Sequence, residues 1–335
     1  MRLGIVVRIC IVTAALTALA GGYMAIGGPE ADRKAPAGGS LYTRLLRASV
    51  EILVDGRMTG SGCFVSSDGV VLTACHVARD KGKHIEIVSP VVGRLTARRI
   101  ATDRGHDLAL LRVSGKKRTY PSLEIAPRIP DALSKVMLSS SPIWRHGLVL
   151  TGSVARARPS YCWQTALKCY IRCIYIDGAS PVGSSGGCWT DSRGRVVGVQ
   201  SGYLNNTDKS PVGIAFAAPA DAIAKLLSEG GDRQVPTMGA AMEELWTQSQ
   251  GFIARLPKGT QGIVTPRLDK GGPLDKAGMT HETLILEIDG KKVIYLDKLL
   301  EIVRSKKPGD RVTLKVIEPI GKPPREIKIR LSKVK

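Results

Sequence analysis

The stretch GSGCFVSSDGVVLTACHV, residues 60–77, is the clearest indication of the fold of the first half of the chain. Two short apolar runs of β-type residues flank Asp68-Gly69, a pair that is typical of tight turns between antiparallel strands. We therefore expect a hairpin here. Folding back at this turn would bring Cys63 and Cys75 nearly opposite one another, and that placement predicts a Cys63–Cys75 disulfide.

Short β-type runs continue from residue 41 to about residue 228, separated by turn residues at the ~8–12 residue spacing typical of sandwiches and barrels. A short helix at residues 220–227 closes this region. Residues 237–335 mix strands with one helix at about 296–304, and their last strand alternates apolar and charged residues. The pattern predicts a mainly β chain with two domains, 41–228 and 237–335, joined by a linker at 229–236.

The composition sets limits on the function. With 335 residues, of which 43% are hydrophobic and 23% charged, the chain can bury two cores, which excludes a mainly disordered protein. Its formal net charge of +20 fits a soluble protein with a basic surface, and it would also suit an anionic lipid or another polyanion. Aromatic residues make up only 4% and are not interleaved with basic ones, so we expect no nucleic-acid partner.

The N-terminus has the features of an export signal. Two arginines precede an uncharged apolar run, and residues 18–20 (ALA) offer a cleavage site with small residues. Residues 1–26 are therefore predicted to be a signal peptide or, if uncleaved, a membrane anchor. Residues 27–40 are rich in Gly, Ala and Pro and are predicted to be a flexible tether. We expect the protein to be exported to the periplasm or another extracytoplasmic space.

Export also places the cysteines in an oxidising compartment, where disulfides are the default. Of seven cysteines, one lies inside the predicted signal and an even six remain. Besides Cys63 and Cys75, these are Cys162, Cys169, Cys173 and Cys188, whose pairing the sequence leaves open. Neither CxxC nor HxxxH spacing occurs, so we expect no metal site, and the chemistry suggested below needs no cofactor.

Three segments carry candidate chemistry. GSSGG at residues 183–187 places Ser185 on a glycine-flanked turn, where backbone N–H groups can converge on an oxyanion. His76 ends an apolar strand. Asp107 immediately precedes a strand that reads as buried on both faces, an expensive place for a carboxylate without a partner. The chain order His76, Asp107, Ser185 is that of the chymotrypsin-type triad, whereas subtilisins and α/β-hydrolases use other orders.

On these motifs the chain resembles the high-temperature-requirement (HtrA/Deg) serine proteases. The strings that carry the resemblance cover almost all of residues 48–228 and include GSGCFVSSDGVVLTACHV, TDRGHDLALLRV, DGASPVGSSGGCW and GRVVGVQSG. Residues 237–335 are similar to a PDZ domain of the same family. The resemblance implies a mainly β fold, in which a trypsin-like double β-barrel protease domain with its active site between the barrels precedes a smaller α+β PDZ-like domain.

The resemblance also implies an activity, that of a serine endopeptidase that cleaves unfolded or damaged polypeptides. Ser185 would attack the peptide carbonyl, His76 would take the serine proton, and Asp107 would hold the imidazole in the required tautomer. Backbone N–H groups of Gly183 and Ser185 would form the oxyanion hole.

In the PDZ-like part, the loop Met238-Gly239-Ala240 takes the place of the one that holds a peptide C-terminal carboxylate in that family. The expected partners are therefore unfolded polypeptides and peptide C-termini. Members of the family often assemble as trimers, so a homotrimer is a further expectation. Two alternatives stay open at this point, a catalytically idle PDZ scaffold that binds peptides and a protein that binds an anionic polymer of the cell envelope.

Overall fold

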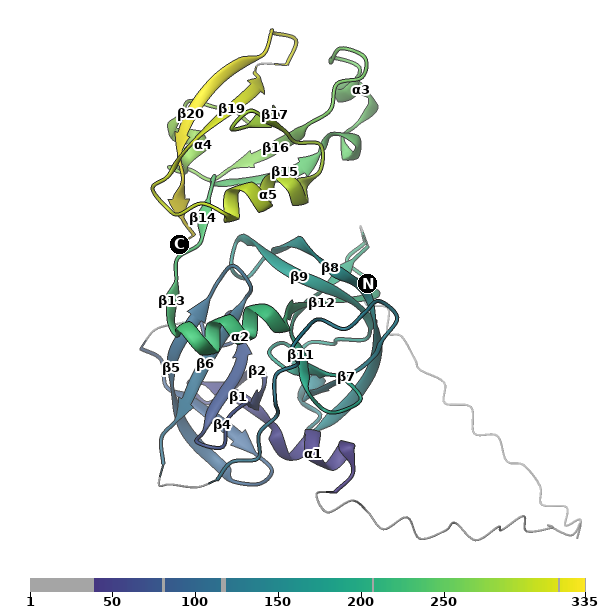
Figure 1. Ribbon diagram of the computed structural model, residues 1–335, viewed down its shortest axis with the longest axis vertical. Coiled ribbons are helices and arrows are strands. Elements are labelled where there is room, and N and C mark those ends of the chain that lie inside the picture. Colours follow the sequence, from purple (N-terminus) through teal and green to yellow (C-terminus); the bar gives the residue numbers. More distant parts are fainter. Residues whose placement is uncertain (1–38, 80–81, 116–118, 207, 319, 335) are drawn as a thin grey trace, which may run out of the picture. The chain divides into compact units, whose positions relative to one another are not determined.

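The computed structural model describes residues 39–334, except for 80–81, 116–118, 207 and 319. The predicted signal or anchor at residues 1–26 and nearly all of the tether at 27–40 lie outside the described residues. The described chain falls within one unit, Ala37–Lys335. It is mainly β, as predicted, with two barrels followed by a smaller mixed domain (Figure 1). Among the described helices, none is long and apolar enough to cross a membrane.

The first barrel consists of six antiparallel strands and is closed because β5 pairs with both β4 and β6. A short strand from the predicted linker, β13 (Gly231–Arg233), joins the outer edge of β5 in parallel. Almost every residue of β3 and β6 is buried, as expected for strands that are covered on both faces. The elements of this barrel are α1 (Leu41–Ala48), β1 (Ser49–Val54), β2 (Arg57–Phe64), β3 (Val70–Ala74), β4 (Ile85–Ser89), β5 (Gly93–Asp103) and β6 (Leu108–Val113).

The hairpin predicted around Asp68-Gly69 is present, and β2 and β3 are its two strands. Gly69 has a φ of +93°, a left-handed conformation that favours glycine. The Val65 N–H donates to the Val70 carbonyl at 2.9 Å, so the loop holds four residues and places Cys63 opposite Leu72. Cys75 therefore lies three residues beyond the position opposite Cys63.

The predicted Cys63–Cys75 disulfide is wrong, and this register is the reason. Cys63 forms a disulfide with Cys188, 125 residues away in sequence, with a Cα–Cα distance of 6.3 Å. Cys188 begins β10 in the second barrel, so the bond cross-links the two barrels. Cys75 is buried in another apolar cluster, together with Cys169 and Cys173. These three cysteines and Cys162 are free thiols.

The second barrel is closed in the strand order β10-β11-β12-β9-β8-β7. The α2 helix follows it and packs on both barrels, which agrees with the helix predicted at residues 220–227. β8 and β9 form a long hairpin that extends toward the C-terminal domain (Figure 1). The elements are β7 (Lys135–Ser140), η1 (Pro142–Trp144), β8 (Leu148–Gln164), β9 (Cys169–Gly178), β10 (Cys188–Thr190), β11 (Val196–Asn205), β12 (Pro211–Pro219) and α2 (Ala220–Glu229).

The C-terminal domain has a sheet in the order β15-β16-β17-β19-β20, with β15 at one edge and α5 beside it. The last long strand, β20, buries Ile327 and Ile329 and exposes the residues between them, as its alternating sequence predicts. The elements are β14 (Pro236–Thr237), β15 (Ala240–Glu244), η2 (Leu245–Thr247), α3 (Gln250–Ile253), β16 (Ile263–Leu268), α4 (Pro273–Lys276), β17 (Thr283–Ile288), β18 (Lys291–Lys292), α5 (Leu296–Arg304), β19 (Arg311–Ile317), β20 (Arg325–Arg330) and β21 (Ser332–Lys333).

Candidate active site

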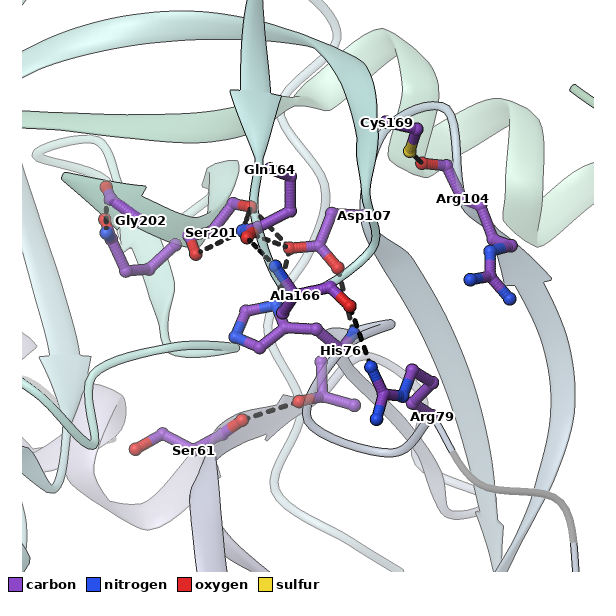
Figure 2. Close-up of polar contacts among 12 residues, drawn as sticks. Ser61, His76, Arg79, Arg104, Asp107, Gln164, Ala166, Cys169, Ser201 and Gly202 are labelled. Atoms are coloured by element: carbon purple, nitrogen blue, oxygen red, sulfur yellow. Dashed lines mark hydrogen bonds and ion pairs between the residues drawn. The ribbon is translucent and has the colours of Figure 1, made fainter. Parts of the chain in front are cut away.

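Asp107 is a fully buried carboxylate that is held by four donors. It precedes β6 with a φ of +57°, a conformation that is uncommon for any residue except glycine. Its Oδ1 accepts from the His76 backbone N–H at 2.9 Å, and its Oδ2 pairs with His76 Nδ1 at 2.7 Å (Figure 2). Gln164 Nε2, 3.3 Å away, and the Ser201 hydroxyl also donate to Oδ2. Such a buried charge is stable because its oxygens are so fully paired.

His76 lies directly after β3, with its side chain only 16% exposed. Burial lowers the pKa of the imidazole, but the charge and the hydrogen bond of Asp107 outweigh it, so the net pKa lies above the ordinary value of 6.5. The pair fixes Nδ1 as the nitrogen that faces the carboxylate and leaves Nε2 for another partner.

Ser185 lies on the turn before β10, partly exposed and tied to the first barrel by its own backbone. Its carbonyl accepts from the Ser61 N–H at 2.8 Å. A Cβ at Gly186, where φ is +83°, would lie 2.2 Å from the Ser61 carbonyl oxygen and 3.1 Å from the Ala74 nitrogen. The turn therefore packs tightly against the end of the strand that leads to His76. Within the described residues, Ser185 Oγ makes no hydrogen bond to the His76 ring.

The peptide groups before Ser185 leave two N–H groups free. The Val182 carbonyl accepts from the Ile143 N–H at 2.7 Å, and a trans peptide then directs the Gly183 N–H the opposite way. Ile143 has a φ of +49°, which is strained for a β-branched residue and marks a loop held by its surroundings. In the described part of the chain, neither the Gly183 nor the Ser185 N–H donates a backbone hydrogen bond. Free donors of this kind can accept a developing negative charge.

Three residues that the sequence analysis did not single out for this site also build it. Ser201 and Gln164 bind Asp107 and each other, with Gln164 Nε2 2.9 Å from Ser201 Oγ (Figure 2). Ser61 is buried and its hydroxyl donates to the Gly183 carbonyl at 2.8 Å. No local pattern marks these side chains, because their partners come from other strands. The structure does bring the predicted Asp107 and His76 together and places the Ser185 turn against the strand that precedes His76.

The residues described include no group of His, Cys, Asp or Glu that could hold a metal ion. The cysteines near the site are buried thiols. Burial and the charge of Asp107 raise the pKa of Cys75 to about 12, and burial raises the pKa of Cys169 to about 11. Both are therefore neutral near pH 7 and poor metal ligands or nucleophiles.

The segment predicted to hold a peptide carboxylate, Met238-Gly239-Ala240, follows β14, and its Ala240 is the first residue of β15. Its Gly239 N–H donates to Thr237 Oγ1 at 3.0 Å, so one of the expected backbone donors is already engaged. The side chains of Met238 and Ala240 are buried in the core of the C-terminal domain.

The edge of β15 beyond this loop carries a side chain from β9. The Tyr170 hydroxyl accepts from the Met242 N–H at 2.8 Å and donates to the Met242 carbonyl at 2.7 Å. Its ring packs edge-on against Trp163, with 5.1 Å between ring centroids, and Arg304 of α5 binds the Tyr170 carbonyl. The space left between β15, α5 and this hairpin is about 20 Å³, room for about one water. The groove beside the loop is thus filled.

Comparisons with known proteins agree with this architecture. Residues 60–199 match the model of a trypsin-like peptidase domain, and residues 236–329 match that of a PDZ domain. A probable periplasmic serine endoprotease of the DegP-like kind from Bartonella henselae is 32% identical over 265 residues, 77% of this chain and 50% of the relative. Serine protease HTRA1 of Xenopus laevis is 27% identical over 80% of this chain and 60% of its own length. The chain thus spans about half the length of the curated relatives it matches.

Solved structures share the fold across nearly the whole chain. The HtrA-type protease AlgW with a tripeptide superimposes with a TM-score of 0.62 at 21% identity, covering 88% of this chain and 96% of that one. A serine endoprotease from Yersinia pestis has a TM-score of 0.58 at 19% identity, covering 88% of this chain and 97% of that one.

Proposed function

The chain is HtrA-type, with a trypsin-like peptidase domain followed by a PDZ domain, and we propose that it is an exported serine endopeptidase that cleaves unfolded polypeptides. The observation that carries the proposal is the buried Asp107 paired with His76 Nδ1 at 2.7 Å. A carboxylate so placed holds the imidazole in one tautomer and stabilises the imidazolium when it forms.

In the proposed reaction Ser185 Oγ attacks the peptide carbonyl and passes its proton to His76 Nε2. His76 then gives the proton to the leaving amine, the acyl group stays on Ser185, and water repeats the sequence to release it. Ser201 and Gln164 keep the Asp107 carboxylate in place through the hydrogen bonds described above. Catalytic hydrogen bonds are often long without substrate, so the serine–histidine contact is expected to form when a peptide binds.

The free N–H groups of Gly183 and Ser185 support an oxyanion hole at this turn. The carbonyl of Val182, in the peptide group that carries the Gly183 N–H, accepts from Ile143. The carbonyl of Ser184, in the peptide group that carries the Ser185 N–H, accepts from the Gly187 N–H at 2.9 Å. Both anchors fix the orientation of the peptide groups before substrate arrives, which is how such a site stabilises a transition state.

The PDZ domain is proposed to bind peptide C-termini in the groove between β15 and α5, where a peptide would add a strand to the edge of the sheet. Tyr170 now holds the Met242 N–H and carbonyl of that edge, so a peptide must displace it. The domain is then open to peptides only when the β8–β9 hairpin moves away. Periplasmic DegP-like relatives support export, which agrees with the signal predicted at residues 1–26.

The test is hydrolysis of an unfolded casein-like substrate by wild type, Ser185→Ala and a matched control, Ser228→Ala. Ser228 is an exposed serine near the end of α2. We expect Ser185→Ala to lose activity by about 10⁴-fold or more and the control to keep it. Equal cleavage by wild type and Ser185→Ala would overturn the proposal. Loss of cleavage in all three proteins, with peptide binding retained, would favour the idle PDZ scaffold.

A further inference from the structure

A basic cavity lies at the edge of the first barrel, and neither the proposed triad residues nor the peptide groove line it. Its volume is about 300 Å³, and β13 pairs with β5 in its wall. Cys75 and Thr102 of the barrel also line it, as does the end of β21. The cavity is lined by five cationic side chains and one carboxylate, namely Arg79, Arg99, Arg104, Arg233, Lys333 and Asp232.

Three of these cations meet no carboxylate in the part of the chain that the structure describes. Arg99 Nη1 donates to the neutral carbonyl of Ala78 at 2.8 Å. Arg104 Nε is buried and has no hydrogen-bond partner, although a buried guanidinium donor usually has one. Lys333 is exposed on β21 and forms no ion pair there. Among the residues that the structure describes, no ion pair therefore neutralises their positive charge.

The acidic groups nearby offset only part of this positive charge, one unit at Asp232 and the charge of Arg233. Asp232, the single carboxylate in the wall, accepts from Thr102 Oγ1 at 2.7 Å. Arg233 is compensated, since its Nε lies 3.3 Å from Asp103 Oδ2 and it also pairs with Glu229. Burial and Asp107 raise the pKa of the Cys75 thiol, while Arg104 and Arg99 act in the opposite direction, so both cations lie near a thiol that stays neutral. The cavity keeps a surplus of positive charge.

We propose that this cavity binds a small, multiply charged anion that carries phosphate groups. Guanidinium groups match phosphate oxygens with paired hydrogen bonds, and a lysine adds a mobile point charge. A cleft with a surplus of positive charge concentrates such anions from solution. A volume of about 300 Å³ suits a compact ligand, at the small end of ligand pockets. A free oligophosphate and the phosphate monoester headgroup of a lipid share this chemistry.

The test titrates the full chain with inorganic tripolyphosphate by calorimetry and, separately, with vesicles that contain phosphatidic acid by co-sedimentation. The double variant Arg104→Gln, Lys333→Gln is compared with Arg158→Gln, Lys328→Gln, which removes the same charge from exposed positions outside the cavity. We expect the first to bind at least about tenfold more weakly and the second to bind as wild type within about twofold. Binding only to vesicles would identify the headgroup as the source, and binding of tripolyphosphate would identify a free phosphate.

Unfolding midpoints of all variants show whether the Arg104 change disturbs the fold. If it does, the single variant Lys333→Gln is compared with Lys328→Gln instead, because the Lys333 side chain is exposed and its replacement should not disturb the fold. We expect Lys333→Gln to bind the probe about two- to fivefold more weakly than Lys328→Gln. Equal losses in cavity and control variants would mean diffuse attraction to a basic surface and would overturn the proposal. Absence of saturable binding to both probes at millimolar concentration would overturn it as well.

Discussion

Replacing Tyr170 with Phe should raise the affinity of the full chain for peptides with apolar C-termini. The Tyr170 hydroxyl donates to one backbone group of Met242 and accepts from another, at 2.7 and 2.8 Å, on the edge of β15 that a peptide would use. Phe keeps the ring and its edge-on contact with Trp163, so the change removes the hydroxyl and little else. The hairpin should then leave the groove more easily.

The magnitude follows from the two hydrogen bonds. Each is worth about 0.5–1.5 kcal/mol net, and Met242 is 4% exposed, so its N–H and carbonyl would lack partners in the closed form of the variant. The closed form should therefore lose about 1–3 kcal/mol, a factor of about 5 to 150 in the closed-to-open ratio. When the closed form dominates, the apparent dissociation constant falls by the same factor.

Fluorescence anisotropy with a labelled decapeptide measures this effect, on a Ser185→Ala background so that the proposed nucleophile cannot cut the probe. The amidated peptide tests carboxylate capture. Tyr161→Phe is the matched control, because Tyr161 belongs to the same hairpin and its hydroxyl makes no hydrogen bond among the described residues. Its affinity should equal that of the parent.

Two outcomes distinguish occlusion of the groove by Tyr170 from peptide binding by the PDZ domain. Saturable binding with equal affinity in the parent and Tyr170→Phe would refute the occlusion of the groove, while peptide binding itself would stand. Absence of binding by both proteins across apolar C-terminal peptides would refute peptide capture by the PDZ domain.

Three further predictions concern stability and pH. Replacing Cys63 and Cys188 by Ala should lower the free energy of unfolding by up to about 5 kcal/mol, because the cross-link spans 125 residues of chain; unchanged urea unfolding without reductant would contradict it. Hydrolysis should fall in acid with a midpoint above pH 6.5, because the charge and hydrogen bond of Asp107 outweigh burial in setting the pKa of His76. The same pair stabilises the fold fully below pH 6.5, and that stability is lost as pH rises through the raised pKa; a pH–rate profile and unfolding at several pH values check both signs.

Local sequence patterns are sufficient to predict several secondary-structure elements and, from them, the fold class. The hairpin at residues 60–77, the alternating last strand and the helix at Leu296–Arg304 follow from patterns a few residues long, because side-chain periodicity is a local property. His76, Asp107 and Ser185 could also be identified as candidates from the sequence, because the glycines and apolar runs that mark them are their neighbours in the chain.

Contacts between residues that lie far apart in the chain depend on the tertiary fold and could not be predicted. Cys63 pairs with Cys188 at a separation of 125 residues, and the Ser201 hydroxyl reaches Asp107 across 94. Tyr170 reaches the β15 edge across 72 residues. These contacts depend on how two barrels close and how the C-terminal domain packs on the β8–β9 hairpin. The hairpin has a four-residue loop instead of the expected two-residue turn, so Cys63 lies opposite Leu72 and not near Cys75. Loop length sets the pairing register of a hairpin, which is why the disulfide was predicted with the wrong partner.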